Sequence, residues 1–189
     1  MISTYKKCWD YLKESKNHFA LIFLILLLFS SIGFFFPYFF VDFIEKFIKS
    51  LLEKTTNMNF YQLFLFIFQN NITTSLIGMI SGIVLGIFPL FLVIFNGYVL
   101  GFIARRAVTK EGFLVLVRLL PHGIFELPAL IISLGLGLKM ASFIFAKTGE
   151  RKKQFYYDLE NSLRIFLFIV LPLLLIAALI EAFFISWLG

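Results

Sequence analysis

Residues 72–104 decide the fold class of this chain, and they read ITTSLIGMISGIVLGIFPLFLVIFNGYVLGFIA. These 33 residues include no Asp, Glu, Lys or Arg, and as one helix they would extend about 50 Å at roughly 1.5 Å per residue. The hydrocarbon core of a bilayer is about 30 Å thick. The stretch is therefore too long for one upright span and too short for two spans with a turn. We expect a long kinked or broken membrane helix, with break points at Pro89 and Asn96-Gly97.

The composition of the whole chain agrees with a membrane protein. Of 189 residues, 60% are hydrophobic, 19% are aromatic and 15% are charged, against about 25% charged in an ordinary soluble domain, and the mean hydropathy is +0.94. These values exclude a water-soluble enzyme, a disordered tail and a nucleic-acid-binding domain. We expect an all-α, polytopic inner-membrane protein with about 4–5 membrane segments. Its expected partners are the lipid bilayer and other membrane proteins, and a homo-oligomer stays open.

Outward from the central stretch, hydropathy and charge divide the single membrane domain into further segments. We expect a cytoplasmic N-terminal segment, a first span, an external amphipathic segment, a re-entrant or hairpin membrane segment and a last span, at residues 1–18, 19–40, 41–71, 113–146 and 165–188. Four Lys or Arg lie in 1–18 and five in 147–164, against three in 41–71. Basic residues collect on the cytoplasmic side, so the N-terminus is expected inside and the C-terminus outside.

The re-entrant assignment rests on basic residues at both ends of 113–146. Arg105-Arg106 and Lys110 precede this segment, and the cluster 147–153 follows it, so both ends are expected in the cytoplasm. The alternative layout divides 72–104 into two short spans and makes 113–138 a full crossing. It places Arg105 and Arg106 outside, against the charge rule.

Glycines recur at intervals of four residues in the central stretch. They are Gly78, Gly82 and Gly86, and then Gly97 and Gly101. Small residues at this spacing form a groove on one helix face, which allows another backbone to approach closely. The pattern predicts helix packing, and we favour packing within the chain over dimerisation.

Polar residues within the apolar segments are candidates for a site, because a charge in the hydrocarbon core costs at least about 2.5–3.5 kcal/mol. His122 and Glu126 are four residues apart, so they share a helix face and can hydrogen-bond. The pair could act as a proton relay, as metal ligands or as a general acid and base, or the two side chains could simply satisfy each other. We favour the structural interpretation. The remaining candidates are Arg118, Lys139, Glu181, Asn96 and Asn71, the last also a plausible helix N-cap.

No pattern for catalysis, metal binding or phosphate binding occurs, such as HExxH, GxSxG or a P-loop. The single cysteine, Cys8, excludes an internal disulfide and a cysteine-built zinc site. We therefore expect no catalytic residues, no metal ligands and no cofactor.

Four motifs together resemble the stage II sporulation protein M family. They are Asn70-Asn71, GIVLGIFP at 82–89, NGYVLG at 96–101 and PHGIFELPA at 121–129, where Pro121, His122, Gly123, Glu126 and Pro128 form the most specific element. The resemblance implies a small polytopic protein without established enzymatic activity. In endospore formers, it implies work in a membrane complex with a peptidoglycan hydrolase and another membrane protein.

These observations favour a non-catalytic scaffold or recruiting subunit of a membrane complex, with a role in cell-envelope remodelling. The first alternative is a transporter or channel-like protein with a midplane site near Asn96, His122 and Glu126, to which Asn71 and Gly97 could contribute. An intramembrane enzyme is the second alternative. A continuous polar cavity around Glu126 would favour the alternatives, and a dry, packed Glu126 would favour the scaffold.

Overall fold

The structure of the protein, a computed structural model, describes residues 2–84 and 86–188, without the side chains of 2, 3, 118–122 and 188. This part of the chain is helical and contains no strand. The elements are α1 (Ile2–Glu14), α2 (Lys16–Phe35), α3 (Val41–Thr55), α4 (Phe60–Ile80), a 3₁₀ turn (Ser81–Ile83), α5 (Ile87–Glu111), α6 (Val115–Ala141), a second 3₁₀ turn (Ser142–Phe145), α7 (Arg151–Ile165), a π-helical turn (Phe166–Val170) and α8 (Leu171–Leu188).

Five helical segments of the described chain are long and apolar enough to cross a membrane. They are Lys16–Phe35, Phe60–Ile83, Ile87–Glu111, Gly123–Phe145 and Arg151–Trp187. The prediction of an all-α protein with about 4–5 membrane segments is therefore confirmed.

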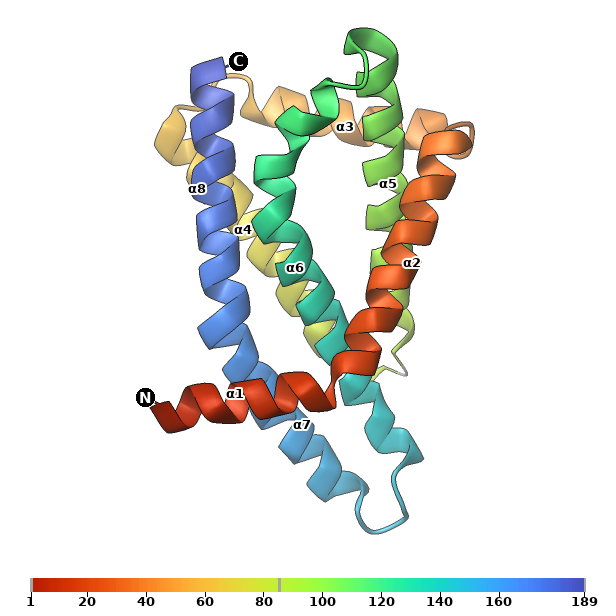
Figure 1. Cartoon of the computed structure of the whole chain (residues 1–189), viewed down its shortest axis with the longest axis vertical. Helices are drawn as coiled ribbons and strands as arrows, with labels where there is room; N and C mark the ends of the chain where they lie inside the picture. The colour runs from red at the N-terminus through yellow and green to blue at the C-terminus, as the bar shows by residue number, and fades with distance from the viewer. Residues whose placement is uncertain (1, 85, 189) are drawn as a thin grey trace.

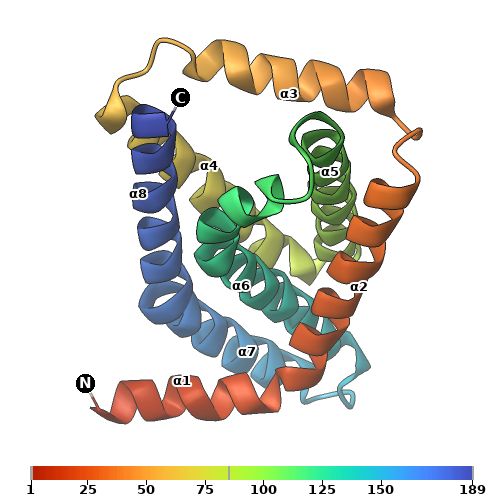
Figure 2. The same cartoon turned by 45° about the horizontal axis from the view of Figure 1, so that its top comes forward.

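The crossing helices form two arms that diverge from one end of the molecule (Figure 1). Helices α2 and α5 pack together as one arm, α4 and α8 as the other, and α6 contacts all four. Helix α3 crosses the open end between the arms, whereas α1 and α7 lie at the narrow end (Figures 1 and 2). We refer to these as the α3 end and the α1 end.

The stretch 72–104 contains a chain reversal and belongs to two helices. Helix α4 ends at Ile80 and α5 begins at Ile87, and between them Gly86 has a φ of +67°, a left-handed conformation that glycine adopts without strain. Pro89 lies in the first turn of α5, where a missing N–H costs nothing, and α5 continues unbroken through Asn96-Gly97. The predicted single helix with breaks at these positions therefore differs from the structure.

Helix α4 also begins earlier than the sequence predicted. Asn59 caps it, because its side chain accepts a hydrogen bond from the Gln62 backbone N–H (3.0 Å) while the Gln62 side chain accepts from the Asn59 N–H (3.0 Å). This reciprocal capping box starts the helix at Phe60. Asn71 consequently lies in the middle of α4 and is not an N-cap. The segment outside the spans ends near residue 59 and not at residue 71.

Helix α6 differs from the re-entrant or hairpin segment predicted over 113–146. It is one continuous helix of 27 residues that runs from the α3 end to the α1 end (Figure 1). Pro121 and Pro128 do not divide it, since neighbouring helices can compensate for the lost backbone bonds. Arg105 and Arg106 consequently lie at the α3 end, as in the alternative layout.

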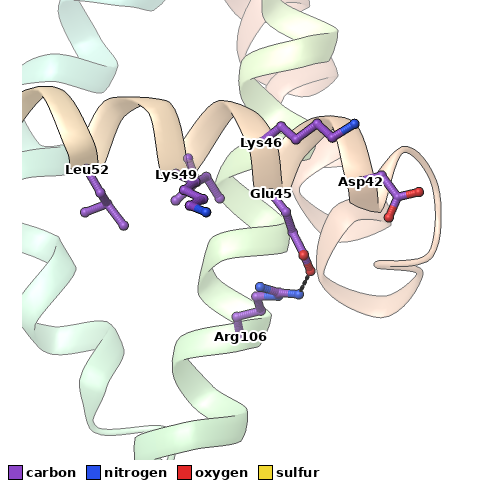
Figure 3. A pocket seen from close by; sticks show the side chains of 7 residues that line it. Asp42, Glu45, Lys46, Lys49, Leu52 and Arg106 are labelled. Carbon is purple, nitrogen blue, oxygen red and sulfur yellow. Dashed lines mark hydrogen bonds and ion pairs between the residues drawn. The ribbon is translucent and has the colours of Figure 1, made fainter.

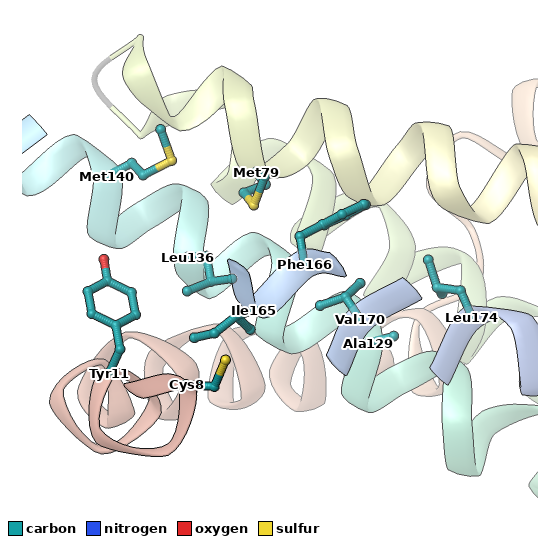
Figure 4. Packing of buried hydrophobic residues seen from close by; sticks show 10 residues of the cluster. All are labelled: Cys8, Tyr11, Met79, Ala129, Leu136, Met140, Ile165, Phe166, Val170 and Leu174. Atoms are coloured by element: carbon teal, nitrogen blue, oxygen red, sulfur yellow. The ribbon is translucent and has the colours of Figure 1, made fainter. Parts of the chain in front are cut away.

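The first helix is fixed to the bundle by apolar and polar contacts. Cys8 and Tyr11 belong to a buried cluster with Leu136, Met140 and Ile165, among others (Figure 4). The Tyr11 hydroxyl donates to the fully buried carboxylate of Asp158 (2.8 Å). Another residue singled out from the sequence, Lys139 of α6, also reaches α1, since its Nζ lies 2.6 Å from Glu14 Oε1.

Candidate functional site

A small polar cavity lies between four helices, near the middle of the membrane-crossing segments. Its volume is about 60 Å³, which is room for a few water molecules. It is lined by Asn70, Asn71, Thr74 and Ser75 of α4, Asn96 of α5, Glu126 and Leu130 of α6, and Leu174 of α8. The structure thus brings together three residues singled out from the sequence, Asn71, Asn96 and Glu126, around one continuous hollow.

Helical spacing explains the polar wall on α4. Asn71, Thr74 and Ser75 are three or four residues apart, so they lie on one face of the helix. The Ser75 carbonyl accepts a hydrogen bond from the Ser133 hydroxyl of α6 (2.6 Å), which joins the two helices at this level. The sequence interpretation missed Asn70, Thr74 and Ser75 as site residues. The same spacing from Asn71 was the signal that could have found Thr74 and Ser75.

Two of the three amide side chains at the cavity, Asn96 and Asn71, have different hydrogen-bond states. Asn96 Nδ2 donates to the Leu92 carbonyl one turn earlier (2.8 Å), which leaves its Oδ1 available as an acceptor. Asn71 Nδ2 is buried and has no hydrogen-bond partner among the described residues. The wall of the cavity therefore carries both a donor and acceptors.

Glu126 provides the carboxylate of the cavity, and one of its oxygens is shielded from solvent. It also interacts with the protein itself. The side chains of Pro121 and His122 lie outside the described residues, so the His122–Glu126 hydrogen bond stays a prediction. Gly123 and Pro128, the other members of the motif, lie on α6 but do not line the described cavity.

The glycines singled out from the sequence lie at contacts inside the chain. A Cβ at Gly101 would lie 1.9 Å from the Ser30 carbonyl oxygen of α2, and one at Gly97 would lie 2.9 Å from the Leu26 oxygen. Gly97 therefore faces α2 and not the polar cavity. The others meet α6: Gly82 at the backbone of Gly137, Gly78 at the side chain of Leu134, and Gly86 at the side chains of Ala141 and Leu138.

A larger, open groove of about 390 Å³ lies between α3 and α5 at the α3 end (Figure 3). It is lined by Asp42, Glu45, Lys46, Ile48, Lys49 and Leu52 of α3 and by Arg106 of α5. An ion pair between Glu45 and Arg106 links the two helices (Figure 3). Acidic, basic and apolar side chains therefore share this groove.

In the described part of the chain, five helices that can cross a membrane, four of which line a polar cavity, define a multi-pass α-helical membrane protein. The chain belongs to the Stage II sporulation protein M family, whose family model matches residues 20–185. This confirms the family resemblance and the multi-pass membrane localisation.

Two curated relatives are uncharacterized proteins of Methanocaldococcus jannaschii. MJ0706 is 33% identical over 135 residues, which is 69% of this chain, and the chain spans 59% of the length of that relative. MJ0793 is 30% identical over 167 residues, which covers 86% of this chain and 92% of the relative. No solved structure matches the chain.

Proposed function

We propose that this protein is a non-catalytic subunit of a membrane complex, which holds a partner protein in the groove between α3 and α5. The size of this groove is the observation that supports the proposal. Its volume is about 390 Å³, against about 60 Å³ for the mid-membrane cavity. A segment of another protein fits a hollow of the first size and not of the second.

The side chains of the groove suit a protein segment of mixed character. Asp42, Lys46 and Lys49 are exposed, and Leu52 offers an apolar surface that is 61% exposed. Complementary charges on a partner would select it and set its register. A contact of this limited extent is typical of a transient complex or of one part of a larger interface.

We place the α1 end in the cytoplasm. The groove lies at the opposite end, and it therefore faces the outer side of the membrane. Nine Lys or Arg lie in 1–18 and 147–164 at the α1 end. Seven lie in the segments at the α3 end: Lys46, Lys49, Lys54, Arg105, Arg106, Lys110 and Arg118 near the start of α6. Basic residues are therefore still more numerous at the α1 end, although α5 ends at the α3 end and not on the side of the N-terminus as predicted. An outward groove suits a role in cell-envelope remodelling.

The mid-membrane cavity supports a second candidate function, a channel-like or transporter-like protein. Ionisable residues inside a membrane mark ion pathways and proton relays more often than packing positions. The volume of about 60 Å³ restricts this candidate to small ions. An organic solute would need a hollow several times larger.

Site-specific crosslinking in native membranes tests the proposed function. A photoreactive residue at Lys49 should capture a discrete partner, whereas one at the exposed Lys152 of the α1 end should not capture the same partner. The double variant Lys46→Glu, Lys49→Glu should lose this partner on purification in mild detergent. The matched variant Lys152→Glu, Lys153→Glu should keep it. A groove variant that retains the full set of partners would overturn the proposal.

A further inference from the structure

The polar cavity lies where the two arms of the molecule meet. Its α4 wall belongs to one arm and Asn96 of α5 belongs to the other, while Glu126 comes from the helix between them. Side chains from three helices that are separate in sequence thus converge on one point in the middle of the bundle. Six of the eight described lining residues are polar, although the surrounding helices are strongly apolar.

We infer that this cavity is a binding site for a small monovalent cation, with Na⁺ as its best fit. The carboxylate of Glu126, the Oδ1 of Asn96 and the hydroxyl of Thr74 are hard oxygen ligands of the kind that such cations prefer. A carboxylate has about four lone-pair sites, so the interaction that Glu126 makes within the protein leaves room for a ligand. This inference is independent of the groove and of the partner proposed for it.

Charge and size favour a monovalent cation over other metals. Among the described residues, no group of three or more His, Cys, Asp or Glu side chains could hold a metal ion, and the described cavity wall carries one carboxylate. Divalent and transition metals usually take several anionic or imidazole ligands. A volume of about 60 Å³ admits Na⁺ with one or two of its water molecules. Such a water would also accept a hydrogen bond from Asn71 Nδ2.

Thermal unfolding of the purified full chain in detergent tests the site. At constant ionic strength and pH, the midpoint in NaCl should exceed that in choline chloride and should saturate with Na⁺ concentration. The expected rise is roughly 3–6 °C at ten times the Kd. LiCl and KCl serve as probes of size, and K⁺ should give the smaller effect.

Substitutions inside and outside the cavity test whether the Na⁺-dependent rise in the unfolding midpoint arises from this site. Glu126→Gln and Asn96→Leu should abolish the Na⁺-dependent rise. The matched variants Glu53→Gln and Asn57→Leu, at exposed positions outside the cavity, should keep it. Direct binding of radioactive ²²Na⁺ to the wild-type protein, competed by unlabelled Na⁺ but not by choline, needs no variant. Equal midpoints in NaCl and choline chloride, or a midpoint that follows pH and not Na⁺, would overturn the inference.

Discussion

Replacement of Gly101 by alanine perturbs the closest helix contact in the α2–α5 arm. A Cβ at this position would lie 1.9 Å from the Ser30 carbonyl oxygen and 2.8 Å from the Phe34 backbone nitrogen. Ordinary contacts between carbon and a carbonyl oxygen are about 3.3–3.6 Å long. The two helices would therefore have to separate by more than about 1 Å. A gap of this size removes a quarter to a half of the dispersion energy of each contact between the two helices.

Two opposing effects determine how much Gly101→Ala changes the stability of the protein. Alanine gains up to about 1 kcal/mol over glycine in helix propensity, whereas overpacking typically costs about 1–3 kcal/mol, occasionally more. Because backbone atoms and not flexible side chains block the methyl group, we expect the steric term to win, with a net loss of about 1–2 kcal/mol. For a chain of this length, the midpoint in detergent should fall by roughly 2–8 °C.

A matched glycine in another helix provides the control. At Gly123 of α6, the nearest described atom to an added Cβ is Leu127 Cδ1 at 3.5 Å, an ordinary contact. Gly123→Ala should therefore leave the midpoint unchanged or raise it. A Gly101→Ala protein that melts at or above the wild-type temperature would refute the close-packing argument for this arm.

Three further predictions concern orientation, the α1 contact and the family motif. In a Cys8→Ser background, a cysteine at Lys49 should react with a membrane-impermeant maleimide in intact cells and one at Lys152 only in opened membranes. Cys8 itself should label slowly, because it is buried and burial raises the pKa of its thiol. Tyr11→Phe should lower stability by about 1–3 kcal/mol, because it leaves the buried Asp158 carboxylate without this donor, whereas Tyr5→Phe at an exposed position should not. If His122 and Glu126 form a hydrogen-bonded pair, His122→Ala or Glu126→Gln should destabilise the protein. The double variant His122→Phe, Glu126→Leu should then recover much of the lost stability. Additive losses of stability would contradict the pairing.

Hydropathy was sufficient to predict the class of the fold but not the path of the chain. The stretch 72–104 alone is too short for two spans, yet α4 begins at Phe60 and α5 ends at Glu111. Each helix thus draws residues from outside the uncharged stretch. The hydropathy pattern assigns residues 60–71 to the external segment, where the apolar run 60–68 is followed by the polar residues Gln69, Asn70 and Asn71. These polar residues are tolerated inside α4, where Asn70 and Asn71 face the cavity.

The charge rule gave the wrong topology for one helix because it was applied locally. Considered locally, Arg105 and Arg106 predict the cytoplasmic side, but in the structure Arg106 forms an ion pair with Glu45 of α3. That partner lies 61 residues away in sequence, so no local pattern indicates it. Summed over all segments, the basic residues still favour the α1 end.

The candidate site could be predicted only in part. Asn71, Asn96 and Glu126 were recognised because polar residues stand out in or beside apolar segments, although Asn71 was also expected to be a helix N-cap. Their meeting depends on the reversal at Gly86 and on the continuity of α6. A sequence interpretation that lacks both features places Asn71 at the start and Asn96 in the middle of one helix, and it cannot bring them to the same cavity.

The distribution of packing contacts bears on whether the cavity serves stability alone. The close seams are made by glycine and apolar side chains: Gly101 against Ser30 in one arm, and Gly82 against Gly137 between the 3₁₀ turn and α6. The buried clusters reach the cavity at Leu130 and Leu174 and continue away from it with apolar residues such as Leu134 and Val170. Larger apolar side chains would fill a hollow of about 60 Å³ and would avoid the cost of placing amides and a carboxylate in the membrane. Packing alone therefore explains the apolar residues around the cavity better than the polar residues that line it, and the cation that we infer for this site would account for the difference.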